Sequence, residues 1–403
     1  MFLDLTERQL ALRDELRSYF AGLISPAERT AMLTERHGTV YREVVRRMGR
    51  DGWLGVGWPA EYGGRGFGQV EQQIFASEAA RADVPLPAVT LQTVGPTLQA
   101  HGTAEQKEFF LPRILAGEVH FAIGYTEPEA GTDLAALRTR AVRVKGDSAG
   151  GTGRRAGDGD SYVVNGEKIF TTGGHDADYV WLACRTDPDA PRHKGISILI
   201  VDTTDPGYSW TPIITLDGAH HTNATYYSDV RVPVTRRVGA ENAGWRLVTT
   251  QLNHERVMLG PAGRLAALHD RVRDWAAART GPDGRPLLDQ PDVRRALGRT
   301  FASLRVNELL NWQVAAADTV EVADASVTKV YSSVRLQQLG QLLEEVVARH
   351  GDPAEEETAQ LRHWLDIQAK RNVVLTFGGG VNEIQRELIA TAGLGLPRVP
   401  RGT

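Results

Sequence analysis

The chain has 403 residues, 41% of them hydrophobic, and its 46 basic and 50 acidic side chains give a formal net charge of -4. This length and apolar content allow two or three packed units around substantial cores. The near balance of charge excludes the strong positive field that nucleic-acid binding requires. No run of about 18 apolar residues occurs, and the first residues carry acids where a signal peptide would need basic residues. We therefore expect a globular protein of the cytoplasm with no membrane partner.

The first segment of the chain has a helical pattern. Apolar residues recur at spacings of three and four in LTERQLALRDELRSYF, PTLQAHG and EQKEFFLPRIL. Glycine- and proline-rich turns such as GWPAEYGGRGFG separate these runs. Residues 1–120 are therefore predicted to form an N-terminal α-helical domain.

The middle segment, residues 121–234, changes to short runs of β-branched and aromatic residues, namely SYVVNGEKIFTT, DYVWLACRT, GISILIVDT and ATYYSDVRVPV. This pattern predicts a β-domain. Asn165-Gly166 is a dipeptide typical of a hairpin turn. Residues 146–160, rich in Gly, Ser and Asp, predict a long and mobile hairpin tip. Cys184, the only cysteine of the sequence, lies in an apolar run and is expected to be buried, with no disulfide inside the chain.

The helical pattern returns in the last segment, in ENAGWRLVTTQLNHERVMLGPAGRLAALHDRVRDWAAAR and DASVTKVYSSVRLQQLGQLLEEVVARH. Residues 235–403 are predicted to form a C-terminal α-helical domain. The order of helices, strands and helices predicts an α+β fold with a β-domain between two helical layers.

Two segments of the middle domain carry residues suited to ligand binding. The sequence YTEPEAGTD, Tyr125 to Asp133, can present hydroxyls and backbone amides to a flat polar ligand or to phosphate. By composition it is equally an ordinary turn. In NGEKIFTTGG, Phe170 offers a face for stacking and Thr172 a hydroxyl, although a lone aromatic residue in a strand is usually core.

These two segments together resemble the flavin-contacting loops of the acyl-CoA dehydrogenase family. Near the C-terminus, Asn382-Glu383-Ile384-Gln385-Arg386 is similar to the family's S-E-I-Q-R segment, and the resemblance covers nearly the whole chain. It implies the family's fold, with a middle β-barrel or sandwich and a C-terminal four-helix bundle. It also implies FAD as cofactor and an activity that introduces an α,β double bond into a CoA thioester.

The resemblance also implies which residues contact the flavin. A ring that accepts hydride and gathers negative charge needs donors already aimed at it. By position, Phe170 would lie against the isoalloxazine, Thr172 would hydrogen-bond near N5, and a further set would line the flavin and pyrophosphate side of the pocket: Tyr125, Thr126, Gly131 and Thr132.

The catalytic base of many relatives is a glutamate three residues before the S-E-I-Q-R-like segment, a position that falls on Gly379 here. Other branches of the family place it in an L-x-x-E-R segment of the first helix after the β-domain. The segment Leu252 to Arg256 resembles that motif and implies Glu255 as the base. The alternative is a solvated helix residue paired with a nearby base. The pair His220-His221 lacks the spacing of a metal site, and we assign no metal.

Two adenine-side motifs of homotetrameric relatives, R-x-x-F-G and Q-x-x-G-G-x-G, are altered in this sequence. No phenylalanine follows Arg279, and residues 351–366 are acidic. Either the chain has diverged within a homo-oligomer, or a different subunit completes each FAD site. The second interpretation agrees with a resemblance to the glutamate-bearing subunit of actinobacterial steroid side-chain acyl-CoA dehydrogenases, which are α2β2 heterotetramers. That resemblance implies a 3-oxo-pregnene-20-carboxyl-CoA type substrate from sterol (cholesterol) degradation and electron-transfer flavoprotein as acceptor.

Two other functions remain open at this point. The chain could be an acyl-CoA oxidase-like or nitroalkane-oxidase-like flavoenzyme, in which reduced flavin reacts with dioxygen. It could also be a non-catalytic flavin-binding or scaffold subunit whose partner holds the base.

Overall fold

The computed structural model describes residues 4–146, 159–258, 260–281, 283–317 and 319–398, with the backbone alone for 252–258. The chain divides into two compact units, each built from segments far apart in the sequence. The first unit comprises Met1–Pro26, Phe67–Leu86 and Asn253–Thr403, and the second comprises Ala27–Gly66 and Pro87–Leu252. We describe each unit by itself.

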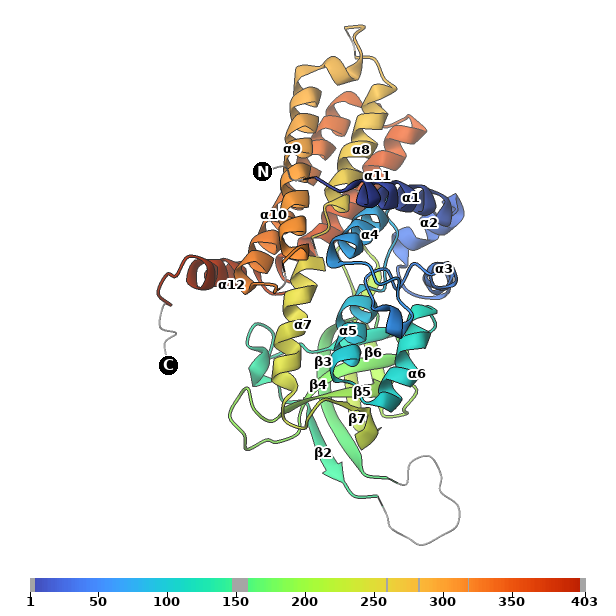
Figure 1. Cartoon of the computed structure of the whole chain (residues 1–403). Coiled ribbons are helices and arrows are strands. Elements are labelled where there is room, and N and C mark those ends of the chain that lie inside the picture. The colour runs from blue at the N-terminus through green and yellow to red at the C-terminus, as the bar shows by residue number, and fades with distance from the viewer. Residues whose placement is uncertain (1–3, 147–158, 259, 282, 318, 399–403) are drawn as a thin grey trace. The chain divides into compact units, whose positions relative to one another are not determined.

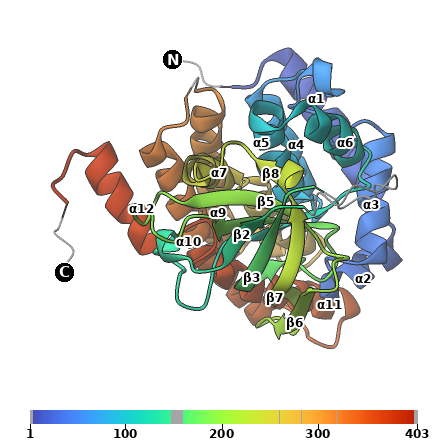
Figure 2. The same cartoon turned by 90° about the horizontal axis from the view of Figure 1, so that it is seen from below.

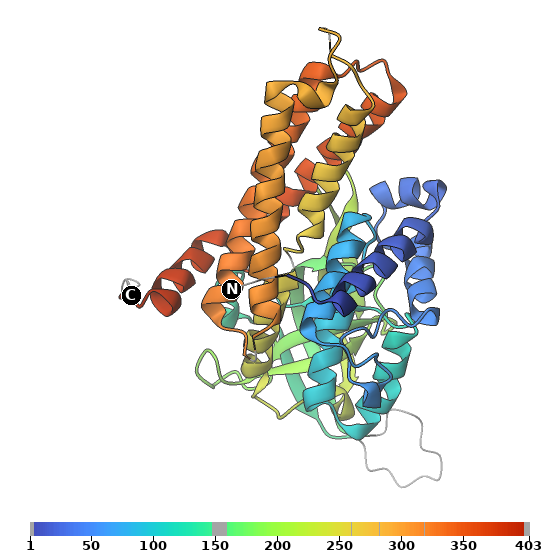
Figure 3. The same cartoon turned by 45° about the horizontal axis from the view of Figure 1, so that its top comes forward.

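The first unit is helical. Its longest members lie alongside one another as a bundle, which Figures 1 and 3 show in yellow, orange and red. Its helices are α1 (Glu7–Leu23), α4 (Gln69–Arg81), α8 (Gly263–Ala277), α9 (Pro291–Ala315), α10 (Val322–His350), α11 (Glu356–Asn372) and α12 (Asn382–Leu388).

Local sequence explains where several of these helices begin and how closely they pack. Thr6 starts α1 with a capping box, in which its side chain accepts from Gln9 N–H and the Gln9 side chain accepts from the Thr6 amide. Pro291 takes the first turn of α9, where its missing N–H costs nothing. A Cβ atom on Gly263 would lie 1.7 Å from the carbonyl oxygen of Ser77, so glycine lets α8 approach α4.

The second unit combines a sheet with helices. Within the described residues, eight strands form one mixed sheet in the order β6-β7-β3-β2-β4-β5-β8, with β1 parallel to β4. Figure 2 shows β2, β3, β7 and β6 crossing this unit side by side. The strands are β1 (Phe121–Gly124), β2 (Arg140–Val144), β3 (Ser161–Thr172), β4 (Tyr179–Arg185), β5 (Ile196–Asp202), β6 (Tyr208–Ile214), β7 (His220–Pro233) and β8 (Arg237–Val238).

The sheet curls around one apolar core. Tyr208 on β6, Tyr162 on β3 and Val201 on β5 belong to the same buried cluster, although β6 and β5 are far apart in the strand order. The thiol of Cys184 is fully buried in this cluster, and burial raises its pKa to about 12. The prediction of a buried cysteine is confirmed.

The helices of the second unit are α2 (Pro26–Thr34), α3 (Thr39–Arg50), the π-helix η2 (Val89–Val94), α5 (Gly95–His101), α6 (Ala104–Leu115) and α7 (Gly244–Met258), whose last residues pass into the first unit. The predicted α+β fold, with helices before and after a β-sheet, is confirmed. No helix in the described parts of the chain is long and apolar enough to cross a membrane.

The prediction of a hairpin turn at Asn165-Gly166 is wrong. Both residues lie inside β3, where the pairing with β7 shifts register between Val164 and Gly166. A Cβ on Gly166 would lie 2.6 Å from Thr139 Oγ1, so this glycine serves close packing at a β-bulge. The hairpin predicted at residues 146–160 does join antiparallel strands, since β2 pairs with β3, but residues 147–158 lie outside the described part of the chain.

Candidate functional site

The two predicted flavin-contacting segments lie together near the end of β3. The Ile169 amide donates to the carbonyl oxygen of Thr126 at 2.8 Å. The loop that follows is closed by reciprocal backbone bonds between Glu127 and Ala130, of 3.2 and 3.1 Å. Segments about forty residues apart in the sequence therefore form one local structure.

A buried ion pair fixes this structure. Lys168 Nζ lies 2.8 Å from Glu127 Oε1 and also donates to the Tyr125 carbonyl oxygen at 3.0 Å. Glu127 further accepts the amides of Arg138 and Thr139, at 2.6 and 2.8 Å. Burial opposes the charge on Glu127, but Lys168 and these hydrogen bonds outweigh it and lower the pKa of the carboxyl. The loop is thereby held by charge-assisted bonds that have almost no contact with solvent.

Phe170 is held in a conformation that few residues other than glycine adopt. Its φ of +59° falls in the left-handed region, at a bulge where the pairing of β3 with β7 shifts between Lys168 and Thr171. The side chain is 60% exposed in this chain, although it is large and apolar. Strained backbone of this kind clusters at ligand sites. The bulge presents the aromatic face at the surface instead of burying it in the strand core.

Four of the remaining predicted cofactor residues are also at least partly exposed. Thr172, Gly131 and Thr132 are exposed, and Thr126 is partly exposed. Tyr125 is different, because it is buried and its hydroxyl donates to Gln251 Oε1. The side chain of Tyr125 therefore holds the loop against α7, and any contact it makes with a cofactor would come from its backbone.

This donor set fits a flavin. An exposed aromatic face and an exposed hydroxyl two residues apart suit a flat heteroaromatic ring with acceptor atoms on its edge. The exposed loop at Gly131 and Thr132 has no Cβ at its first position, and a Cβ there would meet the Thr126 side chain at 3.8 Å. Because Gly131 has no side chain, the pyrophosphate of a cofactor can approach the peptide amides of this loop closely.

The predicted base, Glu255, lies on α7, but its side chain is outside the described residues. The loop that carries the base in many relatives contains Gly379 and Gly380, both in left-handed conformations. The buried Lys329 ammonium fixes this loop by donating to the Gly380 carbonyl at 2.7 Å and to Asn382 Oδ1 at 2.6 Å. This loop is rigidly held, and its glycines offer no acid–base group.

Arg279 is engaged within its own unit. Its guanidinium lies 3.1 Å from Glu355 and 3.2 Å from Glu357, and it stacks on Trp275 with 5.0 Å from the Cζ atom to the ring centre. The arginine and the acidic segment that replace the two adenine-side motifs therefore bind each other. An arginine neutralised in this way is poorly placed to bind a neighbour's phosphate.

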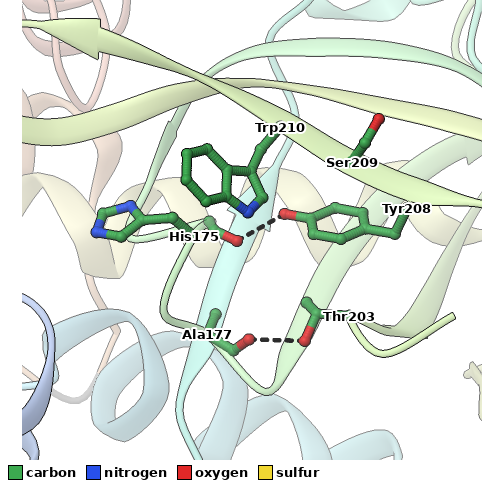
Figure 4. A pocket seen from close by; sticks show the side chains of 7 residues that line it. His175, Ala177, Thr203, Tyr208, Ser209 and Trp210 are labelled. Atoms are coloured by element: carbon green, nitrogen blue, oxygen red, sulfur yellow. Dashed lines mark hydrogen bonds between the residues drawn. The ribbon is translucent and has the colours of Figure 1, made fainter. Parts of the chain in front are cut away.

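A cavity of the second unit is lined by residues other than these. This cavity, of about 330 Å³, lies beside the turn after β3, lined in part by His175, Tyr208 and Trp210 (Figure 4). The Tyr208 hydroxyl donates to the Gly174 carbonyl at 2.8 Å. In the parts of the chain that the structure describes, no group of three His, Cys, Asp or Glu side chains is arranged to hold a metal ion.

The imidazoles near this cavity form a stack. The rings of His175 and His220 are 3.9 Å apart at an angle of 25°, and Asn223 bridges them. Because the Asn223 amide nitrogen donates to His175 Nδ1, that atom acts as an acceptor, and His220 Nε2 carries the proton that Asn223 Oδ1 accepts. The predicted histidine pair is thus part of a hydrogen-bonded structural cluster.

Comparison with known families accounts for this arrangement. The models of the acyl-CoA dehydrogenase N-terminal, middle and C-terminal domains match residues 6–118, 122–230 and 242–394. The chain belongs to the acyl-CoA dehydrogenase family. The acyl-CoA dehydrogenase FadE29 of Mycobacterium tuberculosis is 66% identical over 402 residues, which cover 100% of both chains. FadE26 of the same organism is 48% identical, also over 100% of both.

Two solved structures are also similar to this chain. One chain of the ChsE4-ChsE5 complex from Mycobacterium tuberculosis has a TM-score of 0.87 and 48% identity, with 99% of this chain and 100% of that chain covered. One chain of the Tcur3481-Tcur3483 steroid acyl-CoA dehydrogenase has a TM-score of 0.87 and 46% identity over the same shares. This acyl-CoA dehydrogenase is therefore homologous to subunits of heteromeric steroid enzymes.

Sequence reasoning did not identify the buried residues that hold the candidate site in place. Gln251 accepts from Tyr125 and from Trp181 Nε1, the latter at 3.3 Å, and the Lys168–Glu127 pair holds the loop. No clear signal in the sequence pointed to Lys168, because the run SYVVNGEKIFTT that forms β3 contains several other polar residues.

Proposed function

We propose that this acyl-CoA dehydrogenase binds FAD at the joined loops and introduces an α,β double bond into a CoA thioester. The observation that carries the proposal is that Phe170 and Thr172 are both exposed at the end of β3, beside a loop that the buried Lys168–Glu127 pair fixes to the strand. Family membership supports it, because the family is typically FAD-dependent. When bound, FAD supplies an acceptor for the hydride that leaves the β-carbon.

The residues of this chain perform distinct tasks in that proposal. Phe170 packs against the ring, and Thr172 donates a hydrogen bond near N5. Thr126, Gly131 and Thr132 provide hydroxyls and amides to the flavin and pyrophosphate, while Tyr125 positions the loop through Gln251.

The proton at the α-carbon requires a base, which we propose is Glu255. Gly379 cannot supply one, and α7 carries Glu255 within the L-x-x-E-R-like segment. A carboxylate within hydrogen-bonding reach of an acidic carbon is the usual base for such a transfer. Glu255 would act from the face of the substrate opposite the flavin.

The substrate we propose is a steroid side-chain thioester of the 3-oxo-pregnene-20-carboxyl-CoA type, formed in sterol degradation. The similarity to a steroid acyl-CoA dehydrogenase supports this choice. We further propose an α2β2 assembly with a homologous subunit, which would supply the adenine-side contacts that Arg279 no longer makes, and electron-transfer flavoprotein as acceptor. Two similar solved structures come from two-protein complexes, which agrees with a heteromer.

Anaerobic bleaching of the flavin tests the reaction. The chain, co-purified with its genomic neighbour, is mixed with fatty, branched and steroid CoA thioesters, and loss of flavin absorbance is followed. We expect the steroid thioester to bleach the flavin fastest and the reduced flavin to persist when air is admitted without an electron carrier. Rapid reoxidation by dioxygen would favour the oxidase, and bleaching by no thioester would favour a non-catalytic flavin subunit.

Size-exclusion chromatography with mass analysis tests the assembly. The chain is expressed alone and with its neighbour, and FAD per subunit is measured. We expect full FAD content only in a two-component tetramer. A stable homotetramer with full FAD would exclude the heteromer.

A further inference from the structure

A buried glutamine on the π-helix η2 has an amide group with no partner. Gln92 is 9% exposed, and neither its Nε2 nor its Oε1 has a hydrogen-bond partner among the described residues. Buried polar groups are almost always paired, so an amide unpaired at both ends calls for an explanation. In native proteins, buried polar groups without partners often occur at ligand sites, and π-turns also occur there frequently.

The sequence builds this π-turn at the position of Gln92. Pro96 has no N–H to donate to the carbonyl four residues earlier, and its ring would collide with that carbonyl, which belongs to Gln92. The helix widens instead, and the Gly95 amide bonds the Thr90 carbonyl five residues back. The π-turn is therefore a stable local structure set by Pro96.

Neighbouring side chains hold the π-turn on the other sides. Trp58 Nε1 donates to the Leu91 carbonyl at 3.0 Å, and the Phe121 amide donates to Thr90 Oγ1 at 3.0 Å. A Cβ on Gly95 would lie 2.0 Å from the Trp58 ring. The polar groups of the turn named above have hydrogen-bond partners. The Gln92 amide has none among the described residues.

A chain of hydrogen bonds joins this turn to the candidate site. Thr97 donates to the Thr93 carbonyl at 2.7 Å and accepts from Gln251 Nε2 at 2.8 Å. Gln251 Oε1 in turn accepts the Tyr125 hydroxyl, next to Thr126 in the flavin-contacting loop. The turn that carries Gln92 is thus positioned by the same network as that loop.

We propose that Gln92 binds a keto or hydroxyl oxygen carried on the acyl body of the substrate, away from the thioester. This inference rests on the proposed function and assigns the residue that would recognise an oxygen on the acyl group of its substrate. The Nε2 group can donate to either oxygen, and Oε1 can accept from a hydroxyl. A site built to hydrogen-bond an oxygen rejects the analogue that lacks it, because the protein group then stays unpaired.

Matched ligands test this proposal. Non-reactive thioether analogues of steroid acyl-CoA, with or without a keto oxygen at the ring end far from the sulfur, are titrated into the flavin-loaded enzyme, and Kd is read from the flavin spectrum. We expect the keto analogue to bind at least about tenfold more tightly. In Gln92→Leu this preference should disappear through weaker binding of the keto analogue, while the deoxy analogue binds as before or better.

A matched control and a stability measurement keep the test specific. Gln73→Leu, on α4, removes another buried glutamine whose Nε2 is unpaired and should leave the keto preference intact. Gln92→Leu should also keep or raise the melting temperature of the ligand-free protein, because an unpaired amide is replaced by an apolar group of similar size.

Two outcomes would overturn the inference. Equal binding of both analogues by the wild type would do so while leaving the proposed function standing, and so would a Gln92→Leu protein that loses affinity for both analogues equally. If neither the analogues nor any thioester perturbs the flavin, the proposed function fails, and the inference fails with it.

Discussion

The Lys168–Glu127 pair combines a fully buried ammonium with a carboxylate that is 7% exposed at its side chain. Removing one partner leaves the other charge buried without a counter-charge. The free-energy cost of that lone charge is far larger than the net stabilisation that the intact pair provides. We predict that Lys168→Met lowers the free energy of unfolding by about 3–5 kcal/mol, measured by urea denaturation. Lys370→Met, which breaks the half-exposed pair with Asp366, should cost less than about 1 kcal/mol. Equal effects of the two substitutions would contradict this account of the loop.

The Thr172 hydroxyl is expected to affect the rate of flavin reduction and not the binding of flavin. Thr172→Val keeps the shape of the side chain and removes one donor, so the flavin should stay bound and be reduced about three- to tenfold more slowly. Stopped-flow reduction under anaerobic conditions measures this. Thr211→Val, at an exposed position of β6, is the control and should behave as the wild type. An unchanged rate in Thr172→Val would remove this hydroxyl from the site.

Sequence motifs suggested the residues that we propose face the flavin, but not the buried residues that hold them. Phe170 and Thr172 follow one another in a recognisable segment, so their exposure at one surface could be expected. Gln251 acts through contacts between segments far apart in the sequence, Gln92 is notable for a buried amide without a partner among the described residues, and neither lies in a motif. Their importance depends on burial, which a single sequence does not display.

At the scale of elements, long segments were predicted well and short ones were not. The run SYVVNGEKIFTT coincides with β3, and DASVTKVYSSVRLQQLGQLLEEVVARH lies within α10. Strands β1 and β2 have four and five residues and gave no alternation long enough to recognise. The π-helix η2 was missed because the helical run PTLQAHG was taken to begin at Pro96, whereas Pro96 widens a helix that continues through it.

The contact between Gly95 and Trp58 gives a prediction for that element. Gly95→Ala would place a Cβ 2.0 Å from a rigid indole ring, so we expect a loss of about 1–3 kcal/mol or more in the free energy of unfolding. Gly298→Ala is the matched control on α9, because nothing lies within 4 Å of its added Cβ. It should stabilise the protein by up to about 1 kcal/mol through helix propensity. Chemical denaturation compares them, and a neutral Gly95→Ala would show that the turn is loosely packed.

At the scale of the whole molecule, buried and partly buried histidines make stability depend on pH. Burial and the neighbouring His175 lower the pKa of His37 from 6.5 to about 3, and burial also lowers the pKa of His120 and His175. The unfolded chain therefore binds more protons than the folded chain below pH 6.5. The stability contributed by neutral His37 is complete above that pH and is lost as the pH falls toward 3.

We accordingly predict that the denaturant midpoint falls as the pH is lowered from about 6.5 to 4, and that His37→Gln makes this fall shallower. His363→Gln, at an exposed position of α11, should leave the profile unchanged. A profile in His37→Gln identical to that of the wild type would show that this histidine is not kept neutral by folding.

The most direct test of the whole account is the rate of flavin reduction in Glu255→Gln. The substitution keeps the shape of the side chain and removes its capacity to take a proton, so we predict a protein that retains its flavin and shows no bleaching by the steroid thioester. Glu356→Gln, on the exposed side of α11, should reduce its flavin at the wild-type rate. A Glu255→Gln enzyme that bleaches at a rate near that of the wild type would contradict the assignment of the base to α7.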